Sequence, residues 1–289
     1  MIFDKKKSPY LFLLPFFAMF CFFWLWPILQ SFYWSLLDWD GLRPPTFVGF
    51  RNYLRLMVED DYRVAFRNTI LAAVVYIGIM VSLAVFLGFM LNSAVIGGKT
   101  ALRTAVFLPV TISLPVVALV FFIIYARNNG LLNNILLTIG MTQPVDWLGN
   151  PRINLWSIVA LRVWRAVGFY SVFVLAGLQS IPGELIEAGY IDGASGLQIK
   201  RMIMLPLLRP VIVYVIIASS IFAFQLFEEP WILTQGGPVN STATIAMHVY
   251  RNGFQYFRLG YASASAYVLA FLIVVFALFQ LSSFGKKMS

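Results

Sequence analysis

The sequence predicts an all-α polytopic membrane protein with six transmembrane helices and both termini in the cytosol. Of its 289 residues, 60% are hydrophobic and only 11% are charged, whereas soluble domains are roughly 45–50% apolar and about 25% charged. Aromatic residues reach 17%, and a soluble core of this length cannot bury so much apolar surface. The bilayer is therefore the expected solvent.

Six apolar segments reach the length of about 20 residues that a helix needs to cross the hydrocarbon core. They are residues 10–37, 68–91, 104–125, 155–178, 211–233 and 260–284. Pro15 and Pro27 predict kinks in the first segment, and Pro109 and Pro115 predict kinks in the third.

These segments divide the chain into one membrane domain without a visible internal repeat. We expect a cytosolic tail at 1–9, a first helix at 10–37 and an extracytoplasmic loop at 38–67. A core of five helices, 68–284, follows and contains a cytosolic segment at 180–209, and a second cytosolic tail closes the chain at 285–289. The first helix is expected to lie at the edge of this core.

Lysine sets the predicted orientation. The seven lysines lie at 5–7, 99, 200 and 286–287. If the chain crosses the membrane six times, all of these positions fall on the same side. Because lysine and arginine favour the cytosolic side, that side is expected to be the cytosol. This bias also explains the net charge of +9 without a nucleic-acid partner. The first apolar run is far longer than the 7–15 residues of a signal-peptide core, so we expect an uncleaved first span.

Catalytic constellations are nearly absent from the sequence. His248 is the only histidine and Cys21 the only cysteine, so the chain offers neither a zinc set nor a Cys–His pair. We expect His248 to be an ordinary interfacial residue in the last outer loop. Gly98-Lys99-Thr100 resembles the end of a phosphate-binding loop, but that pattern needs glycine at position 93, where the chain has Ser93. An enzyme or a cofactor-binding chain is not expected.

Four charged residues fall inside the fourth and fifth segments. Arg162 and Arg165 share one helix face, and arginine in a membrane helix usually faces a cavity or a partner, or extends to the interface. Glu228 and Glu229 lie near the outer end of the fifth segment. An Arg–Glu pair within the bundle and a polar lining for a hydrophilic solute both remain open.

The stretch EAGYIDGASGLQIKRMIMLP, residues 187–206, combines acids with small residues. Pro182 and Glu184 suit the first turn of a helix that runs to about Ile191, and Asp192-Gly193 predicts a turn. A second helix is expected from about Ala194 to a stop at Pro206. The small residues leave a surface without bulk, which suits docking to a soluble partner.

The spacing of this stretch resembles the EAA loop of ABC importer permeases. The residues on pattern are Glu187, Ala188, Asp192, Gly193, Ala194, Ile203, Leu205 and Pro206. Gly189 replaces the second alanine, which costs a helix roughly 1 kcal/mol, and Lys200 stands where an aromatic residue is common.

Further stretches resemble the carbohydrate-uptake branch of that family, over nearly the whole chain. They are residues 47–53 (FVGFRNY), 227–238 (FEEPWILTQGGP), 260–264 (GYASA) and 10–15 (YLFLLP), the last being similar to the first permease of maltose and glycerol-3-phosphate systems.

The resemblance implies a type-I ABC importer permease in the bacterial cytoplasmic membrane. Implied partners are a second homologous permease, two ATPase subunits that bind ATP and Mg²⁺, and an extracytoplasmic binding protein that delivers a sugar-like solute. The residues implied to contact the ATPase are Glu184, Glu187, Ala188, Gly189, Asp192, Gly193 and Ala194. By family position the last two spans line the solute pathway, with candidates Phe224, Gln225, Glu228 and Trp231, joined by Arg165.

An ion-driven secondary transporter is the alternative. It would need carboxylates near the centre of the bilayer and inverted repeats. Glu228 and Glu229 lie too near the outer end, and no repeat is visible. The sequence leaves the solute itself open, from a neutral oligosaccharide to an acidic sugar or a glycerophosphodiester.

Overall fold

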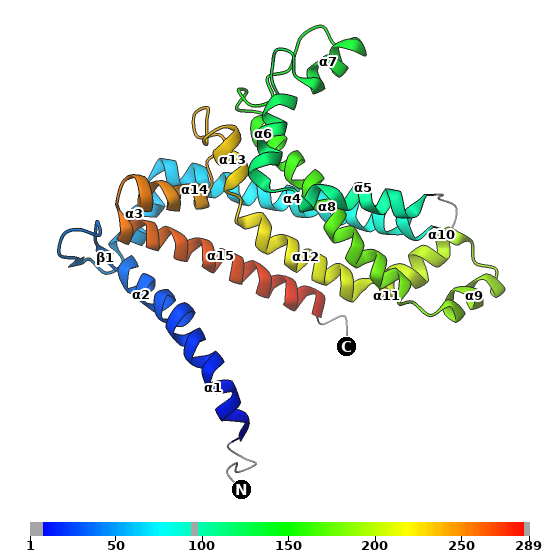
Figure 1. Cartoon of the computed structure of the whole chain (residues 1–289), viewed down its shortest axis with the longest axis horizontal. Coiled ribbons are helices and arrows are strands. Elements are labelled where there is room, and N and C mark those ends of the chain that lie inside the picture. The colour runs from blue at the N-terminus through cyan, green and yellow to red at the C-terminus, as the bar shows by residue number, and fades with distance from the viewer. Residues whose placement is uncertain (1–7, 94–97, 286–289) are drawn as a thin grey trace. The chain divides into compact units, whose positions relative to one another are not determined.

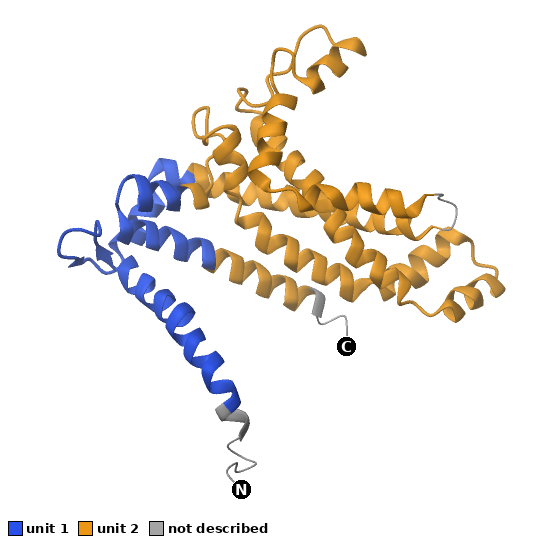
Figure 2. Cartoon of the chain, in the orientation of Figure 1, with its two compact units in different colours: residues 1–63, 248–270 blue, residues 64–247, 271–289 orange. Residues whose placement is uncertain are grey.

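A computed structural model describes residues 8–93 and 98–285, and helices make up about three-quarters of the chain (Figure 1). The lysines at 5–7 and 286–287, and most of the two predicted tails, lie outside the described residues. The described chain separates into two compact units (Figure 2). Residues 1–63 and 248–270 belong to unit 1, and residues 64–247 and 271–289 belong to unit 2.

Unit 1 begins with a long apolar helix. It consists of α1 (Ser8–Phe20), a π-helical turn (Cys21–Leu25) and α2 (Trp26–Ser35). The π-helical turn lies directly before Pro27, and such turns often accompany a break in the regular helical ladder. The central stretch of this span, within Phe12–Ser35, has no buried residue in the described chain.

A buried asparagine marks the end of this first helix. The chain leaves α2 into strand β1 (Leu37–Asp38), which pairs antiparallel with β2 (Thr46–Phe47), and then forms α3 (Arg51–Val58). The Asn52 side-chain amide donates to the carbonyl oxygens of Ser35 at 2.9 Å and Leu37 at 2.8 Å. It thereby satisfies carbonyls that have no partner beyond the helix end.

The remainder of unit 1 comes from the C-terminal part of the chain. It contains the end of α14 (Ile245–Tyr250), a π-helical turn (Arg251–Gln255) and the first part of α15 (Leu259–Gly285). A Cβ on Gly260 would lie 2.0 Å from the carbonyl oxygen of Leu37. Only glycine therefore lets the start of α15 approach β1 this closely.

Unit 2 holds the other helices. They are α4 (Asp60–Asn92), α5 (Lys99–Thr111), α6 (Leu114–Ile124), α7 (Leu131–Thr138), α8 (Asn154–Gln179), α9 (Gly183–Ile191), α10 (Gly196–Ile199), a π-helical turn (Lys200–Met204), α11 (Leu205–Leu207), α12 (Arg209–Phe224) and α13 (Glu228–Leu233). The first turn of α4 lies in unit 1.

Within residues 8–93 and 98–285, five helices or helix runs are long and apolar enough to cross a membrane, and α5 with α6 brings the number to six if this bent pair counts as one span. The third span bends where Pro115 predicted a kink, but the bend is sharp enough to divide it into two helices. α5 and α6 meet at 101°. Pro115 explains the break, because it cannot donate to the Thr111 carbonyl four residues earlier and its ring clashes with that oxygen.

The fifth span is also broken, which the sequence analysis did not predict. α12 ends at Phe224 and α13 begins at Glu228. Pro230 cannot donate to the carbonyl of Leu226, and the Thr244 hydroxyl donates to that oxygen instead, at 2.6 Å.

Small residues let the helices of unit 2 pack backbone to backbone. A Cβ on Gly168 of α8 would lie 1.8 Å from the Val106 carbonyl oxygen of α5, and Gly177 of α8 packs against Leu208 and Val211 at the start of α12. Membrane helices associate through such close contacts, since lipid gives no hydrophobic drive between them. α8 is thus fixed against both broken spans.

Candidate functional site

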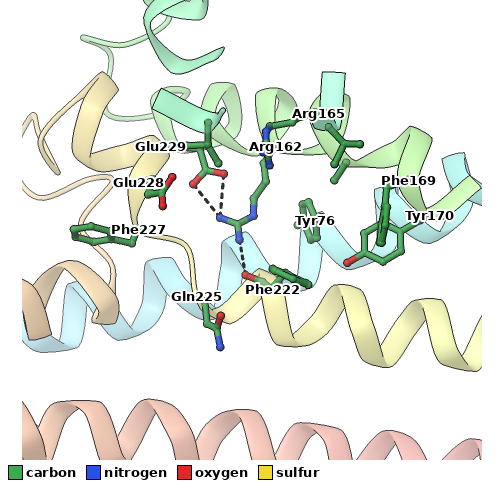
Figure 3. A pocket seen from close by; sticks show the side chains of 13 residues that line it. Tyr76, Arg162, Arg165, Phe169, Tyr170, Phe222, Gln225, Phe227, Glu228 and Glu229 are labelled. Carbon is green, nitrogen blue, oxygen red and sulfur yellow. Dashed lines mark hydrogen bonds and ion pairs between the residues drawn. The ribbon is translucent and has the colours of Figure 1, made fainter. Parts of the chain in front are cut away.

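Unit 2 contains a cavity of about 560 Å³ at the two helix breaks (Figure 3). Its walls come from α4, α5, α6, α8, α12, α13 and the link between the last two. The lining residues are Tyr76, Val110, Leu114, Arg162, Arg165, Ala166, Phe169, Tyr170, Phe222, Gln225, Phe227, Glu228 and Glu229.

Arg162 of α8 joins the two halves of the broken fifth span. Its guanidinium donates to both carboxylate oxygens of Glu229, at 3.0 and 3.2 Å, and to the Phe222 carbonyl oxygen at 2.5 Å. The Tyr76 ring centroid lies 5.6 Å from the guanidinium carbon. The Arg162 and Glu229 side chains are only 12% and 2% exposed. Arg162 therefore forms the Arg–Glu pair left open above and does not extend to the interface.

Arg165 occupies the equivalent position at the broken third span. Its guanidinium donates to the carbonyl oxygen of Ile112 at 3.2 Å, and Ile112 is the residue that caps the C-terminal end of α5. The negative end of the α5 dipole favours a cation there. The Nε of Arg165 is buried without a hydrogen-bond partner among the described residues. Two arginines of α8 thus each bind a carbonyl at the end of a helix that precedes a break.

The residues predicted for the pathway fall into two groups. Gln225 and Glu228 are exposed and line the cavity together with Arg165. Phe224 is buried, with its ring centroid 5.2 Å from that of Phe276, and it is not a lining residue. Trp231 stacks on the lining residue Phe227, with ring centroids 5.7 Å apart. A direct role in solute passage stays a prediction for all five.

Sequence reasoning missed the aromatic lining. Tyr76, Phe169 and Tyr170 come from α4 and α8, far in sequence from the residues that were predicted. The available signal was a tyrosine inside an otherwise apolar span. Tyrosine is common in membrane proteins, so that signal alone does not point to a cavity.

The acidic segment at 180–209 takes largely the expected local structure. α9 ends at Ile191 and Gly193 has φ +79°, which confirms the predicted helix end and turn. The second helix begins later than predicted, at Gly196, because Ser195 caps it in a reciprocal pair with Gln198. Pro206 does not stop it, because a π-helical turn at Lys200–Met204 removes the need for a proline N–H there.

Gly189 has a packing reason to be glycine. It is buried in α9, and a Cβ there would lie 2.8 Å from Ile203 Cδ1 and 3.3 Å from Ile199 Cγ1. The departure from the EAA pattern therefore tightens the contact between α9 and the following helix, at the cost of helix propensity.

The outer surface of this segment mixes acids with bare apolar side chains. Glu184, Glu187, Ala188, Asp192 and Gly193 are exposed, and Ala194 is half-buried. Large exposed apolar residues lie beside them: Tyr190 at 59%, Ile191 at 85%, Leu197 at 76% and Met202 at 71%. Clustered exposed apolar surface rimmed by charge is typical of a protein-binding surface.

His248 is buried, not interfacial as predicted. It is 8% exposed, its Nδ1 lies 3.1 Å from the Ser265 hydroxyl, and Tyr62 and Tyr261 contact the ring edge to face. Within residues 8–93 and 98–285, no group of three histidine, cysteine or carboxylate side chains is placed to hold a metal.

Comparison with known proteins identifies the family. Residues 84–286 match the family described as "Binding-protein-dependent transport system inner membrane component". The chain belongs to this family. It is therefore an ABC transporter permease, a transport subunit and not an enzyme, in the inner membrane, which it crosses several times.

Relatives of this permease match it along its length. The "Arabinooligosaccharides transport system permease protein AraP" of Bacillus subtilis is 34% identical, covering 99% of this chain and 91% of the relative. The "Lactose transport system permease protein LacF" of Rhizobium radiobacter is 34% identical, covering 94% and 92%.

A solved structure has the same architecture. A chain of "a bacterial ABC transporter involved in the import of the acidic polysaccharide alginate" superposes with a TM-score of 0.85. It is 25% identical and covers 98% of this chain and 96% of its own. The permease fold predicted from the sequence is thereby confirmed.

Proposed function

We propose that this permease is one of two non-identical membrane subunits of an ATP-driven importer for a neutral oligosaccharide. A binding protein delivers the solute, and two ATPase subunits supply the work. The cavity at the two helix breaks carries the proposal, supported by relatives named for arabinooligosaccharides and lactose. Its volume of about 560 Å³ falls within the roughly 300–1,000 Å³ of small-molecule sites.

The lining chemistry suits a sugar. Tyr76, Phe169 and Phe227 offer aromatic faces, and Gln225 and Glu228 offer hydrogen-bonding groups to hydroxyls. A few polar groups in a largely apolar wall are typical of a specific small-molecule site.

Charge balance favours a neutral solute over an acidic one. The lining has two cations, Arg162 and Arg165, and two carboxylates, Glu228 and Glu229, which sum to zero. Glu229 neutralises Arg162 directly, and the Ile112 carbonyl occupies part of Arg165. A uronate would meet the exposed Glu228 carboxylate, whose charge balances that of Arg165, so the cavity carries no net positive charge to attract it.

Reconstitution tests this function. The permease is placed in proteoliposomes with its second permease, ATPase and binding protein, and uptake of labelled arabino-oligosaccharide and oligouronate is measured. We expect ATP-dependent accumulation of the neutral sugar alone. Gln225→Ala should reduce uptake several-fold, whereas Gln255→Ala, an exposed residue outside the cavity, should not. Accumulation driven by an ion gradient without the ATPase would establish a secondary transporter.

The proposal assigns the segment Gly183–Met204 to ATPase coupling. Exposed acids beside Tyr190, Ile191 and Leu197 suit a partner groove with a basic and an apolar lining. Loss of one member of a buried interfacial charge pair typically costs about 2–5 kcal/mol. Glu187 is the acid expected to make that pair.

Glu187→Ala should therefore abolish uptake while the chain still inserts and assembles with the second permease. Asp60→Ala, which removes an exposed acid outside the segment, is the matched control. Co-purification of the ATPase and transport-coupled ATP hydrolysis are the readouts. Normal values of both in Glu187→Ala would contradict the assignment.

A further inference from the structure

Unit 1 contains a second cavity that the transport site does not use. Its volume is about 300 Å³, which is small for an oligosaccharide on the scale of known ligand pockets. It lies between the β1–β2 hairpin, α3 and the start of α15. The lining residues are Asp38, Trp39, Val48, Arg51, Asn52, Arg55, Arg258 and Tyr261.

Three arginines line this space against a single acid. Arg51 and Arg55 lie four residues apart on α3 and so share one face of that helix, and Arg258 comes from the residue before α15. Asp38 is the one carboxylate among the lining residues. The lining therefore carries a net charge of +2, from three cations and one anion.

The structure offsets only part of this positive charge. Arg55 lies 4.7 Å from the Tyr261 ring centroid, and its Nε is 4.0 Å from a carboxylate oxygen of Glu59. The Arg258 guanidinium lies 5.8 Å from the ring of Tyr256, outside the cavity lining. Like charges gathered in one small space repel each other, and an anion between them would relieve that repulsion.

The cavity lies beside the ends of two apolar spans, where lipid headgroups are expected. The first span ends at Ser35 and α15 begins at Leu259, on either side of this space. Trp39 lines the cavity, and its ring centroid is 4.8 Å from that of Trp34 at the end of α2. Tryptophan is enriched at the boundary between membrane and water.

Apolar surface continues from the cavity along the first helix. On α2, Leu29 is 55% exposed, Phe32 45% and Tyr33 56%. A molecule with an anionic head in the cavity can place hydrocarbon chains along this surface. A carboxylate on a soluble protein has no hydrocarbon chain to place on this apolar surface of α2.

We propose that this cavity binds the phosphate headgroup of an anionic phospholipid. The guanidinium groups of Arg51, Arg55 and Arg258 bind the phosphate oxygens, for which the planar donor pairs of arginine are suited. Basic pockets between transmembrane helices are known to take lipid headgroups. The transported solute plays no part in this site.

The test compares the assembled transporter in nanodiscs of phosphatidylcholine alone and of phosphatidylcholine with phosphatidylglycerol. Lipid retained on the purified complex is counted by native mass spectrometry, and the midpoint of thermal unfolding is measured. Because each basic residue near an anionic surface contributes about 1 kcal/mol, Arg51→Gln and Arg258→Gln should each weaken phosphatidylglycerol retention roughly fivefold.

Arg43→Gln is the matched control, since Arg43 is an exposed arginine of the same loop outside the cavity, paired with Asp40. It should leave retention unchanged. Where one of the two single variants does not fold, the other still tests the proposal.

Three results would overturn the proposal. The first is equal phosphatidylglycerol retention by the wild type and both variants. The second is stabilisation by inorganic phosphate in phosphatidylcholine that matches the effect of phosphatidylglycerol, which would indicate a free anion. The third is a loss of binding-protein-stimulated ATP hydrolysis in the two arginine variants that is equal in nanodiscs with and without phosphatidylglycerol. That result would indicate that the arginines contact a protein. The lipid readouts need no transport, so they fail independently of the proposed sugar import.

Discussion

The ion pair between Arg162 and Glu229 should behave as one unit, and removing either half should cost more than removing both. Glu229→Leu leaves Arg162, whose side chain is 12% exposed, as an unpaired charge. Breaking a buried pair in this way costs about 3–5 kcal/mol. Because Arg162 also faces the cavity, we expect the lower end, about 3 kcal/mol.

Arg162→Met should be more costly than Glu229→Leu. It strands the Glu229 carboxylate, which at 2% exposed is more deeply buried than the Arg162 side chain at 12%, whereas the Phe222 carbonyl keeps the Gln225 N–H as a donor. The double variant replaces the pair by apolar side chains and leaves no unpaired buried charge, so it should cost less than either single variant.

The assay is the thermal unfolding midpoint of the purified permease in detergent. At roughly 2–4 °C per kcal/mol for a chain of this size, Glu229→Leu should lower the midpoint by roughly 6–12 °C. Glu228→Leu changes the exposed neighbouring acid and should have little effect. The reasoning is refuted if the two leucine variants are equal, or if the Arg162→Met/Glu229→Leu midpoint falls by the sum of the single shifts.

Two further predictions concern other parts of the chain. Gly189→Ala should change the unfolding midpoint little, because the gain of about 1 kcal/mol in helix propensity offsets the cost of shifting the Ile203 methyl group, which lies 2.8 Å from the added Cβ. Gly189→Leu should abolish co-purification of the ATPase. Equal behaviour of the two variants would contradict the packing argument. Burial lowers the pKa of His248 from 6.5 to about 4, so the folded state binds fewer protons than the unfolded state between these values. Stability should fall by about 2 kcal/mol from about pH 7 to pH 5, and His248→Gln should flatten this slope in a melting series; an unchanged slope would exclude the histidine as its source.

Local signals in the sequence were enough to predict the elements of the acidic segment. Gly193 was expected in a turn, and its φ of +79° is the conformation that glycine adopts at little cost. The end of α9 at Ile191 follows from the same turn. These features depend only on residues that are close in sequence, so they can be predicted from the sequence alone.

The helix breaks depend on distant partners and were less visible. Pro115 predicts some distortion, but the 101° bend also requires a donor for the freed Ile112 carbonyl, and Arg165 lies 53 positions away. Without such a donor a freed carbonyl in a membrane is costly. Proline alone cannot separate a kink from a break.

The choice of partner for Arg162 was likewise beyond the sequence. Glu228 and Glu229 are adjacent and chemically identical, and only their positions on α13 decide which one is buried. Glu229 is 2% exposed and Glu228 is exposed. Composition predicted the class of the protein, the local motifs predicted its family, and three-dimensional packing decided which charges are neutralised.

The π-helical turn at Lys200–Met204 has a mechanical consequence. It carries the helix past Pro206, so hydrogen-bonded backbone runs from Gly196 to Phe224 with Leu208 as the one non-helical residue between. At 1.5 Å per residue this path is roughly 40 Å long. This backbone connects the segment proposed to contact the ATPase with the Phe222 carbonyl that Arg162 binds, and it changes direction between α11 and α12 (Figure 1).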